Sequence, residues 1–373
     1  MNLSYWEQKT WLTDIDFAII GSGIVGLSCA LSLRKAHPKS KIVVFEKGML
    51  PSGASTKNAG FACFGSISEI LSDLKAHTEA EVVQLVQDRV NGLKLLRNTL
   101  GDVCIGYQEK GGYELFSEAN DELFNECVKN IEYINKLLFP VFGTNVFFRK
   151  PTPFNFRNVH SEVIFNQFEG QLDTGKMMSA LLEKTSEMGI LVLNNAEIAS
   201  FSSKNEQIWL KTAFSSDIQI RQLFIATNGF AKQFLEADVQ PARAQVLVTR
   251  PIENLEIEGT FHLDRGYYYF RNIENRILFG GGRNLDFKSE QTTQMGLTPL
   301  VQNALDELLR TTILPNTPFE IDTRWSGIMG VGQQKKPIIK TLAPNIYCGV
   351  RLGGMGVAIG SSVGQQLANL SIK

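Results

Sequence analysis

Three glycines at a fixed spacing are the residues of this sequence best suited to chemistry. Gly21, Gly23 and Gly26 follow the apolar run 17–20, and a second apolar run, 42–45, ends at Glu46. In this pattern the glycines allow a tight turn, close approach of the backbone to a pyrophosphate, and close packing of a helix on a strand. The amides that open the helix face the phosphates, and the acid accepts hydrogen bonds from ribose hydroxyls. The spacing predicts a dinucleotide site formed by Gly21, Gly23, Ile24, Val25, Gly26, Glu46 and Lys47.

A second stretch of small residues, 53–60, lies just after the acid, where its backbone can run along the cofactor. Ser55 and Thr56 offer hydroxyl groups to phosphate, and Lys57 and Asn58 are long enough to reach a cofactor ring. An ordinary surface loop has a similar composition, so this alternative stays open.

Two more segments have the chemistry of a ligand-binding turn. The apolar run 223–226 ends in Thr227, Asn228 and Gly229, and open α/β sheets bind ligands at such strand ends. A plain strand-to-helix turn is the alternative. Near the C-terminus, the glycine-rich segment 353–356 precedes an apolar helix, whose first amides can hold an electron-rich ligand atom.

The surrounding sequence must fold so that these segments meet. Hydrophobic periodicity and turn residues predict the main elements. Helices are expected at 27–37, within 67–100, and at 120–138, 174–188 and 356–370. Strands are expected at 190–193, 197–202, 208–212, 218–226, 245–250, 267–271 and 276–279. A nucleotide-binding start and a glycine-rich return at the end indicate a discontinuous first domain, made of 1–76, 165–233 and 326–373, with a substrate domain made of 77–164 and 234–325.

Composition narrows the class of protein. The chain has 373 residues, is 43% hydrophobic and carries a net charge of −1, which argues against nucleic acid or an anionic membrane as a partner. Five scattered cysteines without a C-x-x-C pair suit a reducing compartment. The apolar stretch 17–33 lacks a basic segment before it, so we expect neither a signal peptide nor a transmembrane segment, and we predict a cytoplasmic protein.

Taken in order along nearly the whole chain, these motifs resemble the D-amino-acid oxidase superfamily of FAD-dependent amine and amino-acid oxidoreductases. The branch they resemble most is that of γ-glutamylputrescine oxidase. The segments that carry the resemblance are 4–7, 21–26, 46–47, 53–60, 170–173, 226–229, 241–245, 324–327, 337–339 and 353–356.

The resemblance implies an α/β fold with a discontinuous Rossmann-like FAD-binding domain and a second domain built on an antiparallel sheet. It implies that the loop after the acid lies along the isoalloxazine, that Ile198 contacts adenine, and that Gly353 to Val357 face N1 and C2=O of the flavin. The further residues implied at the FAD site are Ala54, Ser55, Thr56, Lys57, Asn58, Ala59, Gly60, Phe61, Ala226, Thr227, Asn228, Gly229, Gly327, Gly353, Gly354, Met355, Gly356 and Val357.

Several positions depart from the family pattern. Met329 and Ala358 stand where relatives place a cation for the substrate carboxylate, so the preferred substrate is expected to lack a carboxylate on the oxidised carbon. No cysteine lies in 326–336, so FAD is expected to bind noncovalently. Leu278 replaces the lysine that activates O₂ in some relatives, so O₂ or another acceptor stays open.

The candidate catalytic residues are Lys57, Tyr268 and Met329, with Tyr268 placed at the family's substrate-facing tyrosine. Strand alternation would then turn its two tyrosine neighbours to the other face. The remaining cations and histidines receive no firm role. Alternative anion binders, each more often structural, are Arg271, Arg283, Arg324 and Arg351. The histidines without metal-ligand spacing are His37, His77, His160 and His262.

These observations lead to one hypothesis and two alternatives. A small amine or amino acid loses a hydride from its α-carbon to flavin N5, and the resulting imine hydrolyses, with no obligatory protein base. The first alternative is an amino-acid dehydrogenase that passes electrons to a quinone or carrier. The second is an FAD-binding assembly protein without turnover.

Overall fold

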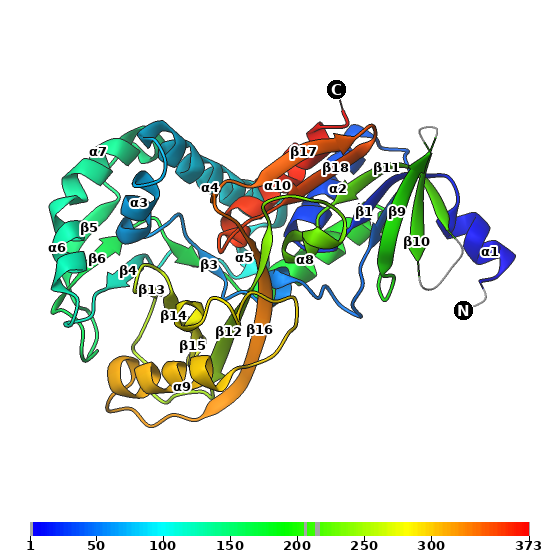
Figure 1. Cartoon of the computed structure of the whole chain (residues 1–373). Coiled ribbons are helices and arrows are strands. Elements are labelled where there is room, and N and C mark those ends of the chain that lie inside the picture. Colours follow the sequence, from blue (N-terminus) through cyan, green and yellow to red (C-terminus); the bar gives the residue numbers. More distant parts are fainter. Residues whose placement is uncertain (1–2, 205–206, 213–216, 373) are drawn as a thin grey trace.

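The computed structural model describes residues 3–204, 207–212 and 217–372. Its first sheet begins with β1 (Ile15–Ile20), which pairs in parallel with β2 (Ile42–Phe45) and with β11 (Ile218–Ile225). Helix α2 (Ile24–Ala36) connects β1 to β2 and completes the predicted β–α–β start (Figure 1). All residues of β2 are buried, as expected for a strand that is covered on both faces.

Strands from distant parts of the sequence extend this sheet. Its order is β17-β18-β11-β1-β2-β8, and β10 and β9 continue from β11. β8 is parallel to β2, and β18 is parallel to β11. β9, β10 and β17 are antiparallel additions. The bounds are β8 Leu191–Leu193, β9 Ile198–Lys204, β10 Gln207–Thr212, β17 Ile338–Ala343 and β18 Ile346–Val350.

Helices close one face of the first sheet. α2 lies beside α10 (Gly356–Asn369), and α8 (Thr174–Glu187) packs next to α2. Leu27, Phe224 and Leu367 are fully buried in the core that these helices form with the strands. The C-terminal helix therefore returns to the nucleotide-binding start, as the glycine-rich return predicted.

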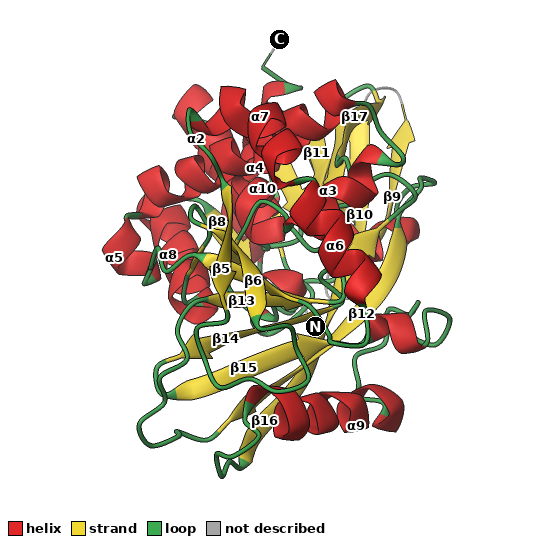
Figure 2. Ribbon diagram, turned by 90° about the vertical axis from the view of Figure 1, so that its left-hand side faces the viewer, coloured by secondary structure: helices red, strands yellow, loops and turns green. Residues whose placement is uncertain are grey.

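A second sheet, mostly antiparallel, lies beside the first. Its order is β16-β12-β15-β14-β13-β4-β6-β5, and only the β13–β4 pair among these is parallel. Helix α9 (Pro299–Leu308) packs on one face, against the buried rings of Phe261, Phe270 and Phe279 (Figure 2). The bounds are β4 Gly112–Leu115, β5 Phe147–Pro151, β6 Glu162–Asn166, β12 Gln240–Thr249, β13 Thr260–Leu263, β14 Tyr268–Ile273, β15 Arg276–Gly281 and β16 Ile321–Val331.

A group of helices covers the β5 end of the second sheet and has its own apolar core (Figure 1). The helices are α3 Ile67–Leu74, α4 Glu79–Leu100, α6 Asp121–Lys129 and α7 Ile131–Phe142. Short elements complete the description. They are α1 Tyr5–Glu7, α5 Asp102–Ile105, β3 Phe61–Ala62 and β7 Gly170–Gln171. Among the residues described, no helix has both the length and the apolar character that a membrane span requires.

The predicted fold class is confirmed, and two details differ. The helix expected over 120–138 is two helices that meet at Asn130. The predicted domain limits at 164/165 and 325/326 fall inside β6 and β16, which both belong to the second sheet. A boundary is expected in a segment that few contacts cross rather than within a paired strand. We therefore propose that both strands belong wholly to the substrate domain.

Candidate cofactor and substrate site

A cavity of about 570 Å³ lies between the two sheets and is lined by both. Most residues that the sequence predicts for the site line it. They are Gly21, Gly23, Ile24, Val25, Glu46, Lys47, Ala54, Ser55, Lys57, Asn58, Ala59, Phe61, Ile198, Ala226, Thr227, Asn228, Gly327, Met329, Gly353, Gly354, Met355, Gly356 and Val357. Five others, Gly26, Thr56, Gly60, Gly229 and Tyr268, are not part of the lining.

The glycine turn has the geometry that its spacing predicts. Gly21 has φ +103°, a conformation that side chains other than glycine rarely adopt, and it places its carbonyl against α2. A Cβ on Gly26 would lie 1.9 Å from this carbonyl oxygen, so Gly26 is needed for helix packing rather than as a contact of the cavity. Gly23 lines the cavity immediately before the first residue of α2.

The loop after the acid is docked onto the start of α2. The Ile24 amide donates a hydrogen bond of 3.0 Å to Ser55 Oγ, which sits where the helix start opens toward the cavity. Asn58 shapes the loop, because its amide donates to the Ser55 carbonyl at 2.8 Å and its Oδ1 accepts from the Gly60 amide at 2.8 Å. The loop is therefore a rigid part of the wall.

Thr56 and Gly60 have different roles from those predicted. The Thr56 hydroxyl donates to the Pro51 carbonyl at 2.7 Å and is not directed at a phosphate. A Cβ on Gly60 would lie 2.2 Å from the Leu172 carbonyl oxygen, so this glycine packs against the segment just after β7. Both residues hold the loop in shape, and neither lines the cavity, although the sequence predicts both as cofactor contacts.

Glu46 lies at the cavity, and its carboxylate accepts hydrogen bonds from a backbone amide and two hydroxyl groups. One oxygen accepts from the Ser22 hydroxyl at 2.8 Å, and the other accepts from the Gly48 amide at 2.9 Å and the Ser52 hydroxyl at 2.7 Å. Burial raises the pKa of Glu46, but these hydrogen bonds outweigh it and leave the pKa below its usual range. The acid is therefore an anionic acceptor, as a ribose contact requires.

The end of β11 contributes a hydroxyl without a partner. Thr227 lines the cavity, and its buried Oγ1 forms no hydrogen bond within the described part of the chain. Asn228 instead fixes the neighbouring loop, because its Oδ1 accepts from the Arg351 and Leu352 amides at 3.1 Å each. A Cβ on Gly229 would lie 2.6 Å from the Met329 carbonyl oxygen, so Gly229 is a packing position and is not part of the cavity lining.

The glycine-rich return reaches the same cavity. Gly353 has φ +60°, and a Cβ built on Gly353 or Gly354 would meet nothing within 4 Å. Helix α10 begins at Gly356, so its first amides open toward the cavity beside these two glycines. The backbone here is bare and accessible, which suits close contact with an electron-rich group.

The second sheet supplies a wall made of side chains. His262 and Tyr269 are opposite each other in the β13–β14 pair, and both line the cavity. Tyr268 points the other way, into the core under α9, where it packs 6.3 Å from the Phe279 ring. The alternation was predicted correctly but in the opposite phase, so Tyr269 and Tyr267 replace Tyr268 as the cavity tyrosines.

A buried ion pair stands behind this wall. His262 Nε2 lies 2.9 Å from Glu169 Oε2, and Glu169 also accepts from the Thr260 hydroxyl at 3.1 Å. Burial lowers the pKa of His262, but Glu169, with Glu69 and Glu114, raises it to about 9. Burial raises the pKa of Glu114 to about 7, against hydrogen bonds from Ser68.

Cys63 completes a group whose spacing would also suit a metal. Its sulfur and the ligand atoms of Glu169 and His262 lie within 4.8 Å of one another. Without a bound metal, burial raises the pKa of the Cys63 thiol well above its usual range, and the group is then a histidine–glutamate ion pair beside a protonated thiol.

The remaining predicted residues occupy distinct parts of the wall. Lys57 packs against Gly327 and accepts a hydrogen bond from the Trp325 indole at its carbonyl, at 2.9 Å. The Lys47 ammonium lies 3.6 Å from the centroid of the Phe230 ring. The Ile198 carbonyl accepts from the Gln233 amide at 3.2 Å.

The residues present fit FAD. A long cavity passes the bare glycine turn, the start of α2, the acceptor Glu46 and the orphaned Thr227 hydroxyl, and it ends under the aromatic wall. Backbone amides and a free hydroxyl are the groups that bind a pyrophosphate, and a carboxylate binds a ribose diol. The second sheet closes the space where the ring would lie.

Known proteins agree with this fit. Residues 16–370 match the family described as FAD dependent oxidoreductase. The chain is 22% identical to probable oxidoreductase OrdL of Haemophilus influenzae over 381 residues, 96% of this chain and 83% of that protein. It is 22% identical to mitochondrial dimethylglycine dehydrogenase of Homo sapiens over 287 residues, 73% of this chain but only 31% of that protein.

Solved structures share the fold. The crystal structure of L-proline dehydrogenase from P. horikoshii has a TM-score of 0.73 at 19% identity, with 96% of this chain and 93% of that chain covered. Glycine oxidase from Geobacillus kaustophilus has a TM-score of 0.73 at 18% identity, with 95% and 94% covered. At such identities the likeness establishes the architecture alone.

Proposed function

The chain belongs to the family of FAD-dependent oxidoreductases, and from this premise we propose that it oxidises a C–N bond of a small amine or amino acid. One observation carries the proposal. A single cavity is lined both by the nucleotide-binding glycines of the first sheet and by Tyr269, Phe61 and Met329 on the side of the second sheet. A substrate in this space would lie against the reactive ring of the cofactor.

The names of the relatives support the same reaction class. L-proline dehydrogenase, glycine oxidase and iminodiacetate oxidase are named for amino-acid substrates, and dimethylglycine dehydrogenase is named for an N-methylated one. The substrate of this chain, its electron acceptor and its place in the γ-glutamylputrescine oxidase branch stay predictions.

When bound, FAD supplies the oxidising power, because it accepts a hydride from the carbon beside nitrogen and leaves an imine that water hydrolyses. The protein supplies the surroundings. Phe61 and Tyr269 pack edge to face at 5.6 Å and form an aromatic part of the chamber wall. The amides at the start of α10, beside Gly353 and Gly354, offer partial positive charge to this part of the cavity. Lys57 lines the cavity from the docked loop, and we propose it as a substrate-side or ring-side cation.

The cofactor is tested first. Purified protein is expected to be yellow and to release intact FAD on acid precipitation, because no cysteine lies in 326–336. Flavin that stays with the precipitate contradicts noncovalent binding. Bound NAD without flavin contradicts the whole assignment.

Turnover is tested on the flavin itself. Anaerobic bleaching of the bound flavin is followed with secondary amines, polyamine conjugates, sarcosine, glycine and both enantiomers of proline. Reoxidation is then followed with O₂ and with a dye acceptor, which separates an oxidase from a dehydrogenase. FAD that no amine in the panel reduces favours a flavin-binding protein without turnover and contradicts the proposal.

A further inference from the structure

The exposed residues of the cavity lining show where the cavity opens beside the second sheet. In the loop between β16 and β17, the residues that are both exposed and part of the lining are Gln333, Gln334 and Lys335. Arg265, in the turn between β13 and β14, is exposed and lines the cavity as well. The cavity therefore opens to solvent at the loop 332–336 and at the turn 264–267.

Lys335 reaches from this loop to an acid on α3. Its ammonium lies 2.6 Å from Asp73 Oδ1, and the Asp73 side chain is only 5% exposed. Asp73 follows Glu69 by one helical turn, and Glu69 also lines the cavity. Within residues 3–204, 207–212 and 217–372, no second cation lies at ion-pair distance from Asp73. One half-exposed lysine therefore joins the edge of the mouth to α3 and neutralises a buried carboxylate.

The backbone on both sides of Lys335 is pinned. A Cβ on Gly332 would lie 2.6 Å from the Asp238 carbonyl oxygen, so the chain packs directly against Asp238 before the lysine. After the lysine, the Lys336 carbonyl accepts from Arg351 at 2.8 and 3.0 Å. Arg351 and Asp238 also pair with each other at 2.8 Å. The loop is thus held at both ends, and the part that is free to move is the Lys335 side chain.

The turn 264–267 is braced by the loop that follows β15. The Gly282 amide donates to the Tyr267 carbonyl at 2.9 Å, and the Asn284 side chain donates to Asp264 Oδ2 at 3.0 Å. One bond comes from the backbone and the other from a side chain, so the turn is tied to the start of this loop at two points.

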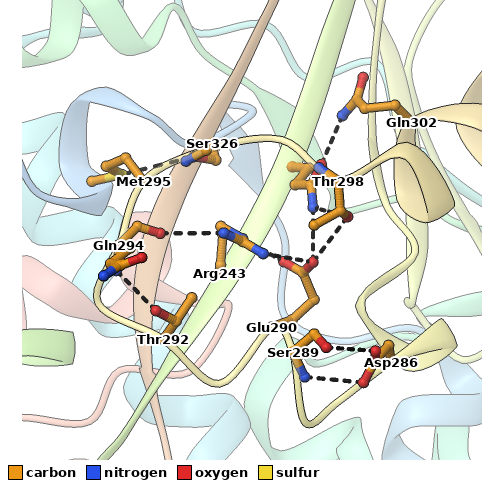
Figure 3. A network of polar contacts seen from close by, with 12 residues as sticks. Arg243, Asp286, Ser289, Glu290, Thr292, Gln294, Met295, Thr298, Gln302 and Ser326 are labelled. Carbon is orange, nitrogen blue, oxygen red and sulfur yellow. Dashed lines mark hydrogen bonds and ion pairs between the residues drawn. The ribbon is translucent and has the colours of Figure 1, made fainter.

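A buried network fixes the loop after β15 in turn. Glu290 is 1% exposed and accepts from Arg243 at 2.7 and 3.0 Å and from the Thr298 hydroxyl at 3.1 Å. Figure 3 shows Glu290 between these two partners, with Asp286 and Ser289 closing the turn before it. This edge of the mouth is held by several buried contacts, whereas the other edge reaches α3 through one ion pair.

We propose that the Lys335 side chain, held by Asp73, is a latch across the mouth of the cavity, and that a molecule larger than O₂ enters beside the second sheet when this ion pair opens. The inference goes beyond the proposed C–N oxidation, because it concerns entry and not the bond that reacts. Opening leaves the buried Asp73 carboxylate without its partner, which is costly, so the open state is the minor one. Rotamer changes of an exposed side chain are fast, so opening needs no movement of the pinned backbone.

The first test measures entry without an amine. FAD in the loaded protein is photoreduced with EDTA as the electron donor, and its reoxidation by benzoquinone is followed anaerobically in stopped flow. Benzoquinone is neutral, so a change of protein charge does not steer it. Because opening is fast, the observed second-order rate constant is the intrinsic one multiplied by the open fraction. Lys335→Met is expected to raise it about tenfold or more, since minor states are populated at roughly 0.1–10%.

Matched variants isolate the ion pair. Asp73→Asn removes the other charge and is expected to raise the rate constant to the same extent, and the double variant is expected to add nothing further. Lys335→Arg keeps the pair and is expected to behave as the wild type. Lys336→Met removes a charge from the neighbouring exposed residue, which lies outside the cavity lining, and is expected to change nothing. Circular dichroism establishes that each variant is folded.

Salt and O₂ give two further measurements. Salt screens a half-exposed ion pair, so added potassium chloride is expected to raise the benzoquinone rate constant of the wild type and to leave that of Lys335→Met unchanged. Reoxidation by O₂, which is much smaller than a ring, is expected to be equal in all variants. This comparison separates a change in entry from a change in the reactivity of the flavin.

The outcomes separate this inference from the proposed function. Equal benzoquinone rate constants in the wild type and Lys335→Met overturn the latch, and so does an equal increase in Lys336→Met. An increase that O₂ shows to the same extent overturns it as well, because the variant has then changed the flavin and not the entry. If no amine reduces the flavin but benzoquinone responds to Lys335 and Asp73 as expected, the C–N oxidation fails while the latch stands.

Discussion

The two walls of the cavity are built from different parts of the chain. The wall on the first sheet is backbone: the glycine turn at Gly21 and Gly23, the glycine-rich segment at Gly353 and Gly354, and the helix starts beside them. The wall on the second sheet is side chain, with Tyr269 and His262 projecting from neighbouring strands. A backbone wall requires particular residues at particular spacings, whereas a side-chain wall depends on which face of a strand is turned inward.

The tyrosines of β14 illustrate the difference. Tyr267, Tyr268 and Tyr269 are identical, so alternation alone leaves their phase open. The phase follows from the partner strand, where Gly280 lies opposite Tyr269 and a Cβ there would come within 2.8 Å of its ring. This glycine makes room for the Tyr269 ring on the cavity face, but Gly281 lies opposite Tyr268 in the same pair of strands, so the glycines of β15 do not reveal the phase from the sequence.

The prediction with the largest expected effect concerns Gly23 in the wall on the first sheet. Gly23→Val is expected to abolish FAD binding, because a branched side chain would fill the space beside the helix start where the pyrophosphate meets the backbone. Even a single Cβ there would lie 2.8 Å from Ser55 Oγ. The flavin-to-protein absorbance ratio is the measurement, with circular dichroism to establish that the variant is folded. A folded variant with an unchanged ratio would show that this turn does not hold the cofactor.

The same contrast explains how far sequence reasoning reached. The β–α–β start, the acid at Glu46 and the glycine-rich return were predicted, because each needs a residue type that few other structures demand. Thr56 and Gly229 are absent from the cavity lining although the sequence predicts both for the site, because a hydroxyl or glycine beside a ligand and one turned into the loop look identical in sequence. The His262–Glu169 pair was missed, since its partners are 93 residues apart and meet only through the pairing of β13 with β4.

The second prediction tests which tyrosine of β14 faces the cavity. Tyr268→Ala is expected to lower the free energy of unfolding by about 3–5 kcal/mol, because it leaves a cavity in the core under α9. Tyr269→Phe is expected to leave stability nearly unchanged and to alter the rate of flavin reduction. Denaturant unfolding and anaerobic stopped-flow reduction measure the two effects. If Tyr268→Ala instead alters only the rate of flavin reduction and Tyr269→Phe alters stability, Tyr268 is the cavity tyrosine.

The third prediction concerns the charge of the side-chain wall. The pKa of His262 is raised to about 9, so the folded protein holds this proton more tightly than the unfolded chain does. The resulting stability is fully present below the ordinary histidine pKa and is lost as pH rises toward 9. The expected fall is on the order of 2–3 kcal/mol, from one linked proton.

Glu114 also contributes stability to the folded protein that is lost as pH rises. Because its pKa is about 7, this loss falls below pH 7. Between pH 7 and 8 the slope therefore belongs to His262, because the buried thiols of Cys29, Cys63, Cys127 and Cys348, whose pKa values burial raises, add a fall of the same sign only as the pH approaches the ordinary thiol pKa of about 8.5. Denaturant unfolding at fixed excess FAD measures it, and His262→Gln is expected to flatten the curve in this window. A slope that persists in the variant would show that the proton resides elsewhere.

The prediction with the smallest expected effect concerns the Thr227 hydroxyl in the wall on the first sheet. Thr227 Oγ1 is buried and lacks a partner in the cofactor-free chain as far as it is described, so a bound ligand is the group that would satisfy it. Thr227→Val keeps the shape and removes the hydroxyl. It is expected to weaken FAD binding severalfold, equivalent to about 1 kcal/mol, and to leave the FAD-free protein equally or more stable.

Thr227→Ser separates the hydroxyl from the methyl group and is expected to keep the affinity for FAD. Fluorescence titration of the FAD-free protein with FAD measures the affinities, and thermal unfolding measures the stabilities. If the valine variant binds FAD as tightly as the wild type, the hydroxyl faces no ligand. The end of β11 would then act only through Asn228, which fixes the loop at Arg351 and Leu352.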